Sequence, residues 1–120
     1  MLHRTTEIVA NMKVFPERMG RNLDATKGLV FSGQLLQDLV EHGAPREDAY
    51  KWVQGHATTA WESETNFQDR VAADANIRKF LDEKALAHTF DLQRQLRSVD
   101  AIFFRVFGRR VSGAKSSAAV

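Results

Sequence analysis

The stretch LVFSGQLLQDLVEHGAPREDAYKWVQGHATTAW, residues 29–61, contains two apolar patterns of helical spacing with a break between them. The first covers residues 29–42, where leucines and valines recur every three or four positions on one face. Gly43 suits the left-handed residue that ends a helix, and Pro45 cannot continue one. A second helix is predicted over residues 46–61, with an apolar face of Tyr50, Val53, Ala57, Ala60 and Trp61.

The segment before this pair also has helical spacing. Its apolar stripe, with steps of four, three and four residues, consists of Ile8, Met12, Phe15 and Met19. Pro16 either kinks this helix or lies in the first turn of a new one, because proline lacks the amide donor of a helix interior. Residues 22–28 contain turn and capping residues and are predicted to form a connection. The stripe starts close to Met1, so we expect a further segment to precede it.

The segment after the pair predicts several shorter helices. One starts at Asn66, which can cap it, and runs to about Ala73. Two short pieces are expected around residues 77–81 and around Leu86. A single long amphipathic helix is then predicted to end at Gly108, on the face formed by Leu92, Leu96, Val99, Phe103 and Val106. No segment alternates long enough to be a strand, so the predicted fold class is all-α, a small multi-helix domain.

Composition and charge exclude several classes of protein. The 120 residues are 43% hydrophobic and 27% charged, as in soluble globular domains, and the absence of cysteine excludes disulfides and thiolate metal sites. No apolar run approaches the roughly 20 residues that span a bilayer, and the first residues lack the apolar core of a secretory signal. We therefore expect a cytoplasmic protein with no membrane partner.

The net charge of +2 depends on the end of the chain. No acidic residue follows Asp100, and four basic ones do: Arg105, Arg109, Arg110 and Lys115. Without them acidic residues outnumber basic ones, so a generally basic nucleic-acid-binding body is not indicated. Residues 108–120 are predicted to be a disordered basic tail. A nucleic-acid contact through this tail stays open as an alternative, although a solubilising helix end explains the arginines as well.

A search for chemistry finds no assembled site. The four histidines, none at metal-ligand spacing, are His3, His42, His56 and His88. His42 is expected at a helix C-terminus, where the helix dipole favours a cation, and His56 is interpreted as partly buried and hydrogen-bonded rather than catalytic. Ser32 lies in neither a phosphate loop nor a nucleophile elbow and is interpreted as a surface or packing hydroxyl.

The remaining candidates also have structural interpretations. The acidic pairs Glu47-Asp48 and Asp82-Glu83 fall where helix N-termini are predicted, and the dipole stabilises carboxylates there. Trp52 and Trp61 are interpreted as packing anchors rather than a stacking platform. We therefore assign no catalytic, cofactor-binding or metal-binding residue and expect no cofactor.

A family resemblance goes beyond this residue-level interpretation. The run Val14–Met19, then Asn22-Leu23, Thr26 and Gly28–Ser32, resembles the C-terminal region of bacterial adenylosuccinate lyases. The resemblance spans roughly residues 8–107 and continues through Leu39–Gly43, Arg46–Tyr50, Val53-Gln54, Phe90-Asp91 and Val99–Phe103. Gly55–Trp61 departs from the family's pattern. The related carboxymuconate cycloisomerases share this domain and suit Asn22–Thr26, while Arg46–Tyr50 and Val53-Gln54 favour the lyases.

The resemblance implies a cytoplasmic homotetramer of the fumarase/aspartase superfamily that acts in purine and AMP biosynthesis. Such enzymes remove fumarate from adenylosuccinate, leaving AMP, and from the succinyl-carboxamide ribotide, by a β-elimination that uses no metal or organic cofactor. The family's base is a serine on a mobile loop and its acid is a histidine of an earlier segment. Neither context occurs in this sequence, so the chain alone is predicted to be inactive.

The resemblance also divides the chain. Residues 1–22 are predicted to be the end of a central-bundle helix and a connection, residues 23–107 the C-terminal helical domain, and residues 108–120 the tail. The implied partners are the remainder of the lyase chain and the homotetramer, and the isolated chain is expected to be able to self-associate through exposed apolar positions. A free-standing helical interaction module is the alternative from a different functional class.

Overall fold

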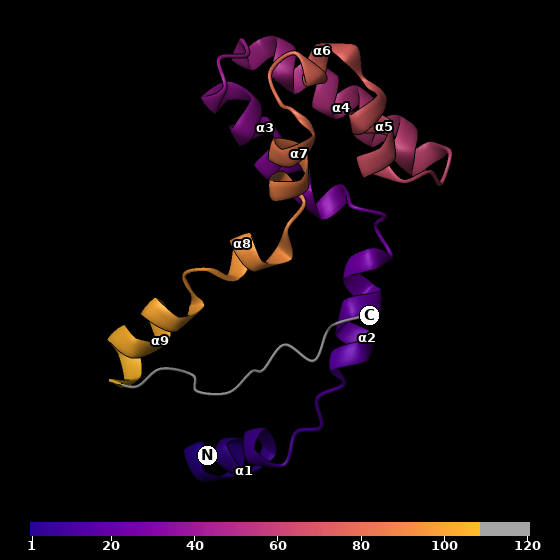
Figure 1. The fold of residues 1–120 in the computed structure, drawn as a ribbon. Coiled ribbons are helices and arrows are strands. Elements are labelled where there is room, and N and C mark those ends of the chain that lie inside the picture. The colour runs from indigo at the N-terminus through magenta and orange to yellow at the C-terminus, as the bar shows by residue number, and fades with distance from the viewer. Residues whose placement is uncertain (109–120) are drawn as a thin grey trace.

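The computed structural model describes residues 1–108, and these form helices without any strand (Figure 1). The expected all-α class is thereby confirmed. Apart from Gly108, the predicted basic tail lies outside the described residues. In chain order the elements are α1 (Leu2–Ala10), α2 (Pro16–Asp24), the 3₁₀ helix η1 (Leu29–Phe31), α3 (Ser32–Glu41), α4 (Arg46–Glu62), α5 (Phe67–Ala73), α6 (Ala75–Arg78), α7 (Glu83–Thr89), α8 (Leu92–Leu96) and α9 (Val99–Phe107).

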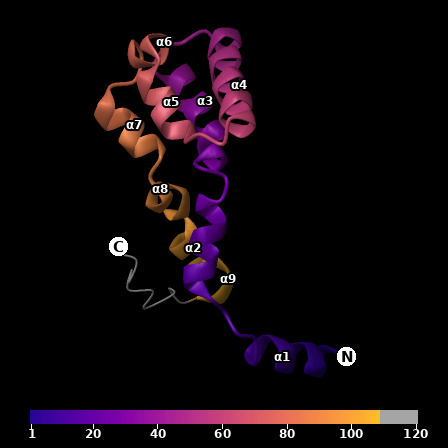
Figure 2. The same ribbon diagram turned by 90° about the vertical axis from the view of Figure 1, so that its right-hand side faces the viewer.

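The helices form a packed head and two projecting arms (Figures 1 and 2). We call residues 29–91 the head, residues 1–28 the N-terminal arm and residues 92–108 the C-terminal arm. The radius of gyration is 18.2 Å, against about 14 Å for a compact domain of this length. The difference arises because α1, α2 and α9 extend away from the head.

All of the hydrophobic core lies in the head. The α3 and α4 helices pack against each other, with α5 on α4 and α7 on α3. The buried hydrophobic residues are Leu35, Leu39, Ala44, Ala49, Val53, Ala60, Phe67, Val71, Ile77, Leu81 and Leu86. Trp52 adds to this core from the side, because its ring stacks on Phe80 with centroids 6.1 Å apart.

Short side chains start the four helices from α5 to α8. Each accepts a hydrogen bond from a backbone N–H of the first turn and so satisfies a donor that has no partner inside the helix. The four capping residues are Asn66, Asp74, Asp82 and Asp91. The predicted cap at Asn66 is confirmed, and both acidic pairs lie at helix N-termini as expected.

Two glycines set the turns around α3. Gly43 has a φ of 93° after the end of α3, and the N–H of Ala44 donates to the Leu39 carbonyl oxygen at 2.9 Å, which confirms the predicted helix end. Gly28 has a φ of 91° and joins the N-terminal arm to the head. A Cβ added at Gly28 would lie 3.8 Å from the Phe90 ring and the Gln68 backbone, so the backbone angle and not the available space requires glycine.

Two predicted boundaries change. Pro16 starts a new helix, which confirms one of the two alternatives, but α2 continues through Asp24 into the predicted connection. The prediction of one long helix from Leu92 to Val106 is wrong. The chain forms two helices there, α8 and α9, which are separated at Arg97 and Ser98. The head holds α8 but no buried residue belongs to α9, so packing does not enforce one straight helix across a serine of weak helix propensity.

The predicted apolar face of α4 is confirmed at Val53 and Ala60, which are buried, and is wrong at Tyr50 and Trp61. The residues of α4 that are buried against α3 and α5 are Ala49, Val53 and Ala60. Tyr50 and Trp61 are 54% and 71% exposed, so their prediction as core or anchor residues is wrong. One position corresponds to about 100° around a helix, which moves both large rings off the buried face.

The joint at Gly28 can be tested by substitution. Gly28→Ala forces a Cβ into the left-handed region and is expected to lower the free energy of unfolding by about 1 kcal/mol. The matched control is Gly55→Ala, which lies in the interior of α4 with no atom near its added Cβ and should raise stability by about 0.5–1 kcal/mol. Urea unfolding of the three proteins measures both effects, and equal midpoints for the two variants would contradict the role of the positive φ.

Candidate functional site: an apolar docking surface

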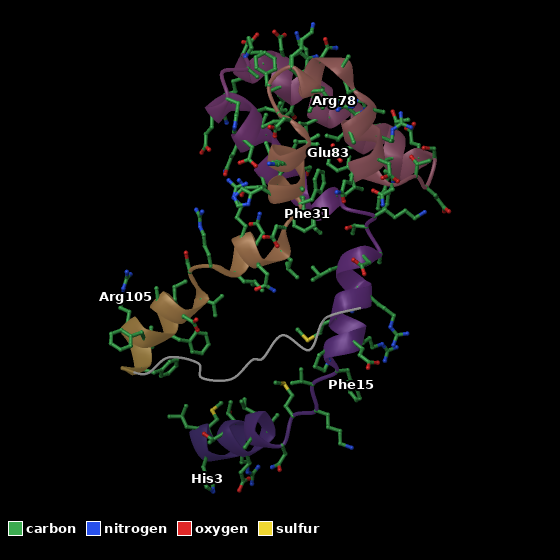
Figure 3. All side chains as sticks on the ribbon, viewed as in Figure 1. His3, Phe15, Phe31, Arg78, Glu83 and Arg105 are labelled. Carbon is green, nitrogen blue, oxygen red and sulfur yellow. The ribbon has the colours of Figure 1, made fainter. Side chains whose placement is uncertain are left out.

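The N-terminal arm exposes most of its large apolar side chains. Leu2 and Ile8 on α1 are 86% and 72% exposed, and Met12, Phe15 and Met19 continue the exposed surface onto α2. No residue of α1 or α2 is buried. Phe15 projects from the arm well away from the head in Figure 3. A helix with an apolar stripe gains stability only when the stripe is covered, so this arm is built to pack against another structure.

The C-terminal arm ends in a helix whose apolar residues cover most of its circumference. The sequence of α9 is VDAIFFRVF, whose charged residues are Asp100 and Arg105, and none of its residues is buried. The rings of Phe103 and Phe107 lie 5.6 Å apart, one turn from each other. A helix that is hydrophobic all round is stable when it is buried on several faces. We therefore take α9 together with the apolar stripe of α1 and α2 as the docking surface.

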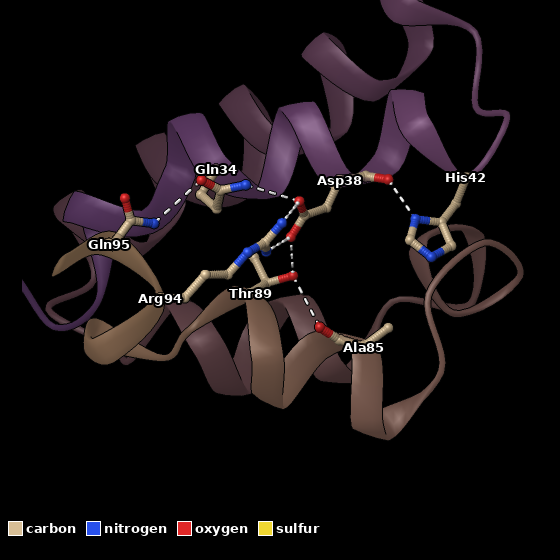
Figure 4. Close-up of polar contacts among 7 residues, drawn as sticks. All are labelled: Gln34, Asp38, His42, Ala85, Thr89, Arg94 and Gln95. Carbon is tan, nitrogen blue, oxygen red and sulfur yellow. Dashed lines mark hydrogen bonds and ion pairs between the residues drawn. The ribbon is translucent and has the colours of Figure 1, made fainter. Parts of the chain in front are cut away.

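The orientation of the C-terminal arm depends on one buried ion pair. The Asp38 side chain of α3 is 4% exposed, and the Arg94 guanidinium of α8 donates to both of its carboxylate oxygens at 2.6 and 2.8 Å. The buried Thr89 hydroxyl donates to Oδ2 at 2.5 Å, and Gln34 donates to Oδ1 at 2.8 Å (Figure 4). This network connects α3, α7 and α8, so the position of the arm is fixed where it leaves the head.

The network also determines the protonation state of the carboxylate. Burial raises the pKa of Asp38, but the hydrogen bonds from Arg94, Thr89 and Gln34 and the positive charge of Arg94 outweigh it, so the pKa of Asp38 lies below its ordinary value. The hydrogen bond and charge of Asp38 raise the pKa of Arg94 in turn, against its own desolvation. Both groups are therefore charged at neutral pH.

The N-terminal arm is joined to the head by backbone contacts. The carbonyl oxygen of Lys27 accepts a hydrogen bond from the Phe67 N–H at 2.9 Å, and the Lys27 ammonium donates to the carbonyl oxygen of Glu64. Lys27 itself has a φ of 51°, in the left-handed region. The connection after α2 is thus bound to the loop between α4 and α5.

The histidines do not converge on a site. His3 is exposed and pairs with Glu7 one turn away at 3.4 Å, and His88 lies in the last turn of α7. His42 caps the end of α3, as expected, with Nδ1 2.7 Å from the Asp38 carbonyl oxygen. Among residues 1–108, no group of three or more side chains could hold a metal ion.

His56 makes the closest histidine contact. Its Nε2 lies 2.5 Å from Oδ2 of Asp74, and Oδ1 of the same carboxylate accepts the Asn76 N–H at the start of α6. Burial raises the pKa of Asp74, but the contact with His56 and the backbone N–H donors lower it by more. The pKa of Asp74 therefore lies below its ordinary value. The pair ties α4 to the start of α6, which confirms the interpretation of His56 as a partly buried, hydrogen-bonded histidine.

The hollow beside His56 does not complete a catalytic arrangement. Its volume is about 630 Å³, and its lining includes Asn66, Asp69, Arg70 and Asp74. The Nε atom of Arg70 is buried there without a hydrogen-bond partner. Nucleophilic catalysis needs a nucleophile and a base within hydrogen-bond reach of each other. His56 is paired with a carboxylate, so the lining offers a histidine–aspartate pair without a nucleophile positioned against it.

The ion pair between Asp38 and Arg94, which positions the arm, was not predicted from the sequence. Asp38 lies three residues after Leu35 and one before Leu39, so it occupies the buried face of α3 and not the solvated one. A carboxylate on an apolar face is the signal that could have found it, since a buried charge needs a partner. Its partners, Thr89 and Arg94, lie more than 50 positions away and have no local pattern that identifies them.

Two further observations concern surfaces. No helix within residues 1–108 has the length and apolar character needed to cross a membrane. Arg105 lies in the last turn of α9, where the helix dipole favours a cation, while Arg109 and Arg110 lie outside the described residues.

Comparison with known proteins identifies relatives. Residues 28–106, from the joint to α9, match the family described as adenylosuccinate lyase C-terminus. Adenylosuccinate lyases of Bacillus subtilis and Thermotoga maritima are both 42% identical to the chain over 88% of its length, and so is that of Synechocystis. These alignments cover 25%, 24% and 25% of the relatives, so the chain spans about a quarter of their length. Each alignment is longer than the stretch from Gly28 to Val120 and therefore includes part of the N-terminal arm.

Loss of the Arg94 side-chain charge is expected to destabilise the head strongly. Arg94→Met leaves the Asp38 carboxylate buried without its partner, which costs about 3 kcal/mol. The matched control Arg78→Met removes an exposed arginine and should change the unfolding free energy by less than about 0.5 kcal/mol. Chemical unfolding at pH 7 measures the difference, and a loss no larger than that of the control would show that the ion pair does not hold the arm.

The same pair predicts a pH dependence. The folded-state pKa of Asp38 lies below its unfolded value of about 3.9, so its contribution to stability is complete above that value and is lost as pH falls through the folded pKa. In Arg94→Met the desolvated carboxyl has a raised pKa, and protonation relieves the penalty. The stability gap between wild type and variant should therefore shrink as pH falls from 7 towards 4, as followed by thermal unfolding. A constant gap would contradict this assignment.

Proposed function

Because the chain belongs to the family of adenylosuccinate lyase C-terminal domains, we propose that it serves as the C-terminal domain of an adenylosuccinate lyase. That enzyme cleaves adenylosuccinate to AMP and fumarate, and the succinyl-carboxamide ribotide to the carboxamide ribotide and fumarate, in purine biosynthesis. The chain's share of the work is structural. The comparisons name lyases, so the cycloisomerase alternative is not retained.

The observation that carries the proposal is the pair of arms. A domain of this size normally covers its large apolar side chains, yet the two arms together expose Leu2, Ile8, Val9, Met12, Phe15, Met19, Leu23, Val99, Ile102, Phe103, Phe104, Val106 and Phe107. This surface fits a partner that supplies helices of its own. The relatives are about four times longer than the chain, so we propose that the remainder of such a lyase is that partner.

The two arms fit different environments in the assembly. The amphipathic N-terminal arm suits a position along the side of a helical bundle, with one face covered. The helix α9, whose apolar residues cover most of its circumference, suits a position between helices, with several faces covered. We propose that both environments are provided by the central bundle of a cytoplasmic homotetramer, and that the isolated chain self-associates through the same surface when the bundle is missing.

The chemistry of the reaction comes from outside the described residues in this proposal. A β-elimination needs a base that removes a proton and an acid that protonates the leaving nitrogen, on either side of the bond that breaks. His56 is paired with Asp74, and the hollow beside it lies between α4 and α5. The head therefore acts by positioning the arms and not by touching the reacting atoms.

Complementation tests the proposal. The Bacillus subtilis lyase without its matched C-terminal quarter is mixed with the 120-residue chain, and adenylosuccinate cleavage is followed by absorbance. Neither piece alone should turn over substrate, and the mixture should, because the chain completes the fold of the bundle. Cleavage by the chain alone would contradict the structural role.

Substitutions on α9 separate docking from folding. Phe104→Glu places a charge on an exposed ring position of α9, and it should abolish assembly with the truncated lyase while leaving the unfolding midpoint of the head unchanged. Lys84→Glu, an exposed position of α7 on the head, is the matched control and should assemble like the wild type. Sedimentation measures the assembly. Normal assembly of Phe104→Glu would show that α9 is not part of the docking surface and would favour a free-standing module.

A further inference from the structure

The helices α3 and α4 end in the same way but with different residues. In both, the N–H of the second residue beyond the cap donates to a carbonyl oxygen in the last turn: Ala44 to Leu39 at 2.9 Å, and Thr65 to Ala60 at 3.1 Å. This arrangement needs a left-handed residue directly before the donor. After α3 that residue is Gly43, and after α4 it is Glu64, with a φ of 52°.

Glu64 is an unfavourable choice at this place for two reasons. A side chain in the left-handed region is strained, whereas glycine adopts it freely. The C-terminus of α4, the longest helix among residues 1–108, is also the negative end of its dipole, where a carboxylate is repelled. Its last turn contains no basic residue. Helix termination therefore does not explain a glutamate at this position.

Glu64 lines a hollow next to an exposed tryptophan. The hollow has a volume of about 410 Å³ and lies between the end of α2 and the end of α4, lined by Ala25, Thr26, Lys27, Leu29, Ala60, Trp61 and Glu64. Trp61 is 71% exposed and is the largest exposed hydrophobic side chain of the head. Exposed tryptophans beside pockets are frequent anchors of protein interfaces.

The charges around the hollow leave one carboxylate without a partner. The Lys27 ammonium is engaged by the carbonyl oxygen of Glu64 and so compensates the negative helix end. Within residues 1–108 the Glu64 carboxylate forms no ion pair. An exposed indole face and the carboxylate of Glu64, which forms no ion pair, together attract a cation.

We propose that Trp61 and Glu64 form a receptor for an arginine side chain presented by the remainder of the lyase. The assignment rests on the proposed function for the source of the arginine. Arginine fits better than lysine, because its planar guanidinium can stack on the indole while its N–H groups donate to the carboxylate. The hollow adjoins the joint of the N-terminal arm, so this contact would fix the head relative to the bundle on which the arm packs.

Peptide titration of the 120-residue chain tests the receptor. The probes are the capped tripeptides Gly-Arg-Gly, Gly-Lys-Gly and Gly-citrulline-Gly, where citrulline has the shape of arginine without its charge. In ¹H–¹⁵N NMR spectra, the arginine peptide should shift the Trp61 indole N–H resonance saturably and leave that of the core residue Trp52 in place. The lysine peptide should bind more weakly and the citrulline peptide should not bind. Equal shifts with citrulline, or none with arginine, would overturn the proposal.

Variants of Glu64 distinguish recognition from folding. Glu64→Gln keeps the shape and should weaken arginine binding about threefold. Glu64→Gly should lose the binding yet raise the Tm by about 3–5 °C, because glycine relieves the left-handed strain. A lower Tm for Glu64→Gly would show that the glutamate is retained for folding and would overturn the proposal.

The outcome is separable from that of the proposed function. Arginine binding without assembly on the truncated lyase would refute the lyase role and leave the receptor standing. Assembly without any arginine-dependent shift, and with full activity in Glu64→Gln, would refute the receptor and leave the lyase role standing.

Discussion

The ion pair between Asp38 and Arg94 is the interaction on which the arrangement of the chain depends. The pair is buried and bidentate, and Thr89 and Gln34 donate further hydrogen bonds to the Asp38 carboxylate. Each carboxylate oxygen therefore accepts two hydrogen bonds. A buried ion pair contributes little net stability compared with an apolar replacement, but removal of one partner is costly. In this chain the Asp38–Arg94 pair has a geometric effect, because it fixes where the C-terminal arm leaves the head.

The head and the arms follow opposite rules of burial. The core of the head closes on itself through residues such as Leu35, Phe67 and Ile77, all without exposed surface. The arms keep their apolar side chains in solvent and gain almost nothing from the head. The head thus has a core of its own, whereas the arms have apolar surfaces that fit a partner. This division agrees with the similarity of the chain to the C-terminal part of much longer lyases.

Sequence reasoning succeeded where structure is determined locally. Gly43, Pro45 and Asn66 mark helix ends through backbone angles and single hydrogen bonds, and these were predictable. It failed at Trp61 and at the break before α9, where the orientation of a helix and the contacts of its neighbours decide. The Asp38–Arg94 pair was not predicted either, since its partners are far apart in the sequence and only the tertiary fold brings them together.

The central claim is that the head folds by itself while the arms become ordered surfaces of a larger assembly. Amide hydrogen exchange of the 120-residue chain, diluted until it is monomeric, measures this directly when the chain is compared alone and with the truncated Bacillus subtilis lyase. The account predicts strong protection at Leu39 and Val71 in both samples, and protection of Ile102 to Phe104 in α9 that rises sharply only when the lyase is present. Protection of α9 equal to that of α4 in the monomeric chain, or no gain on addition of the lyase, would contradict it.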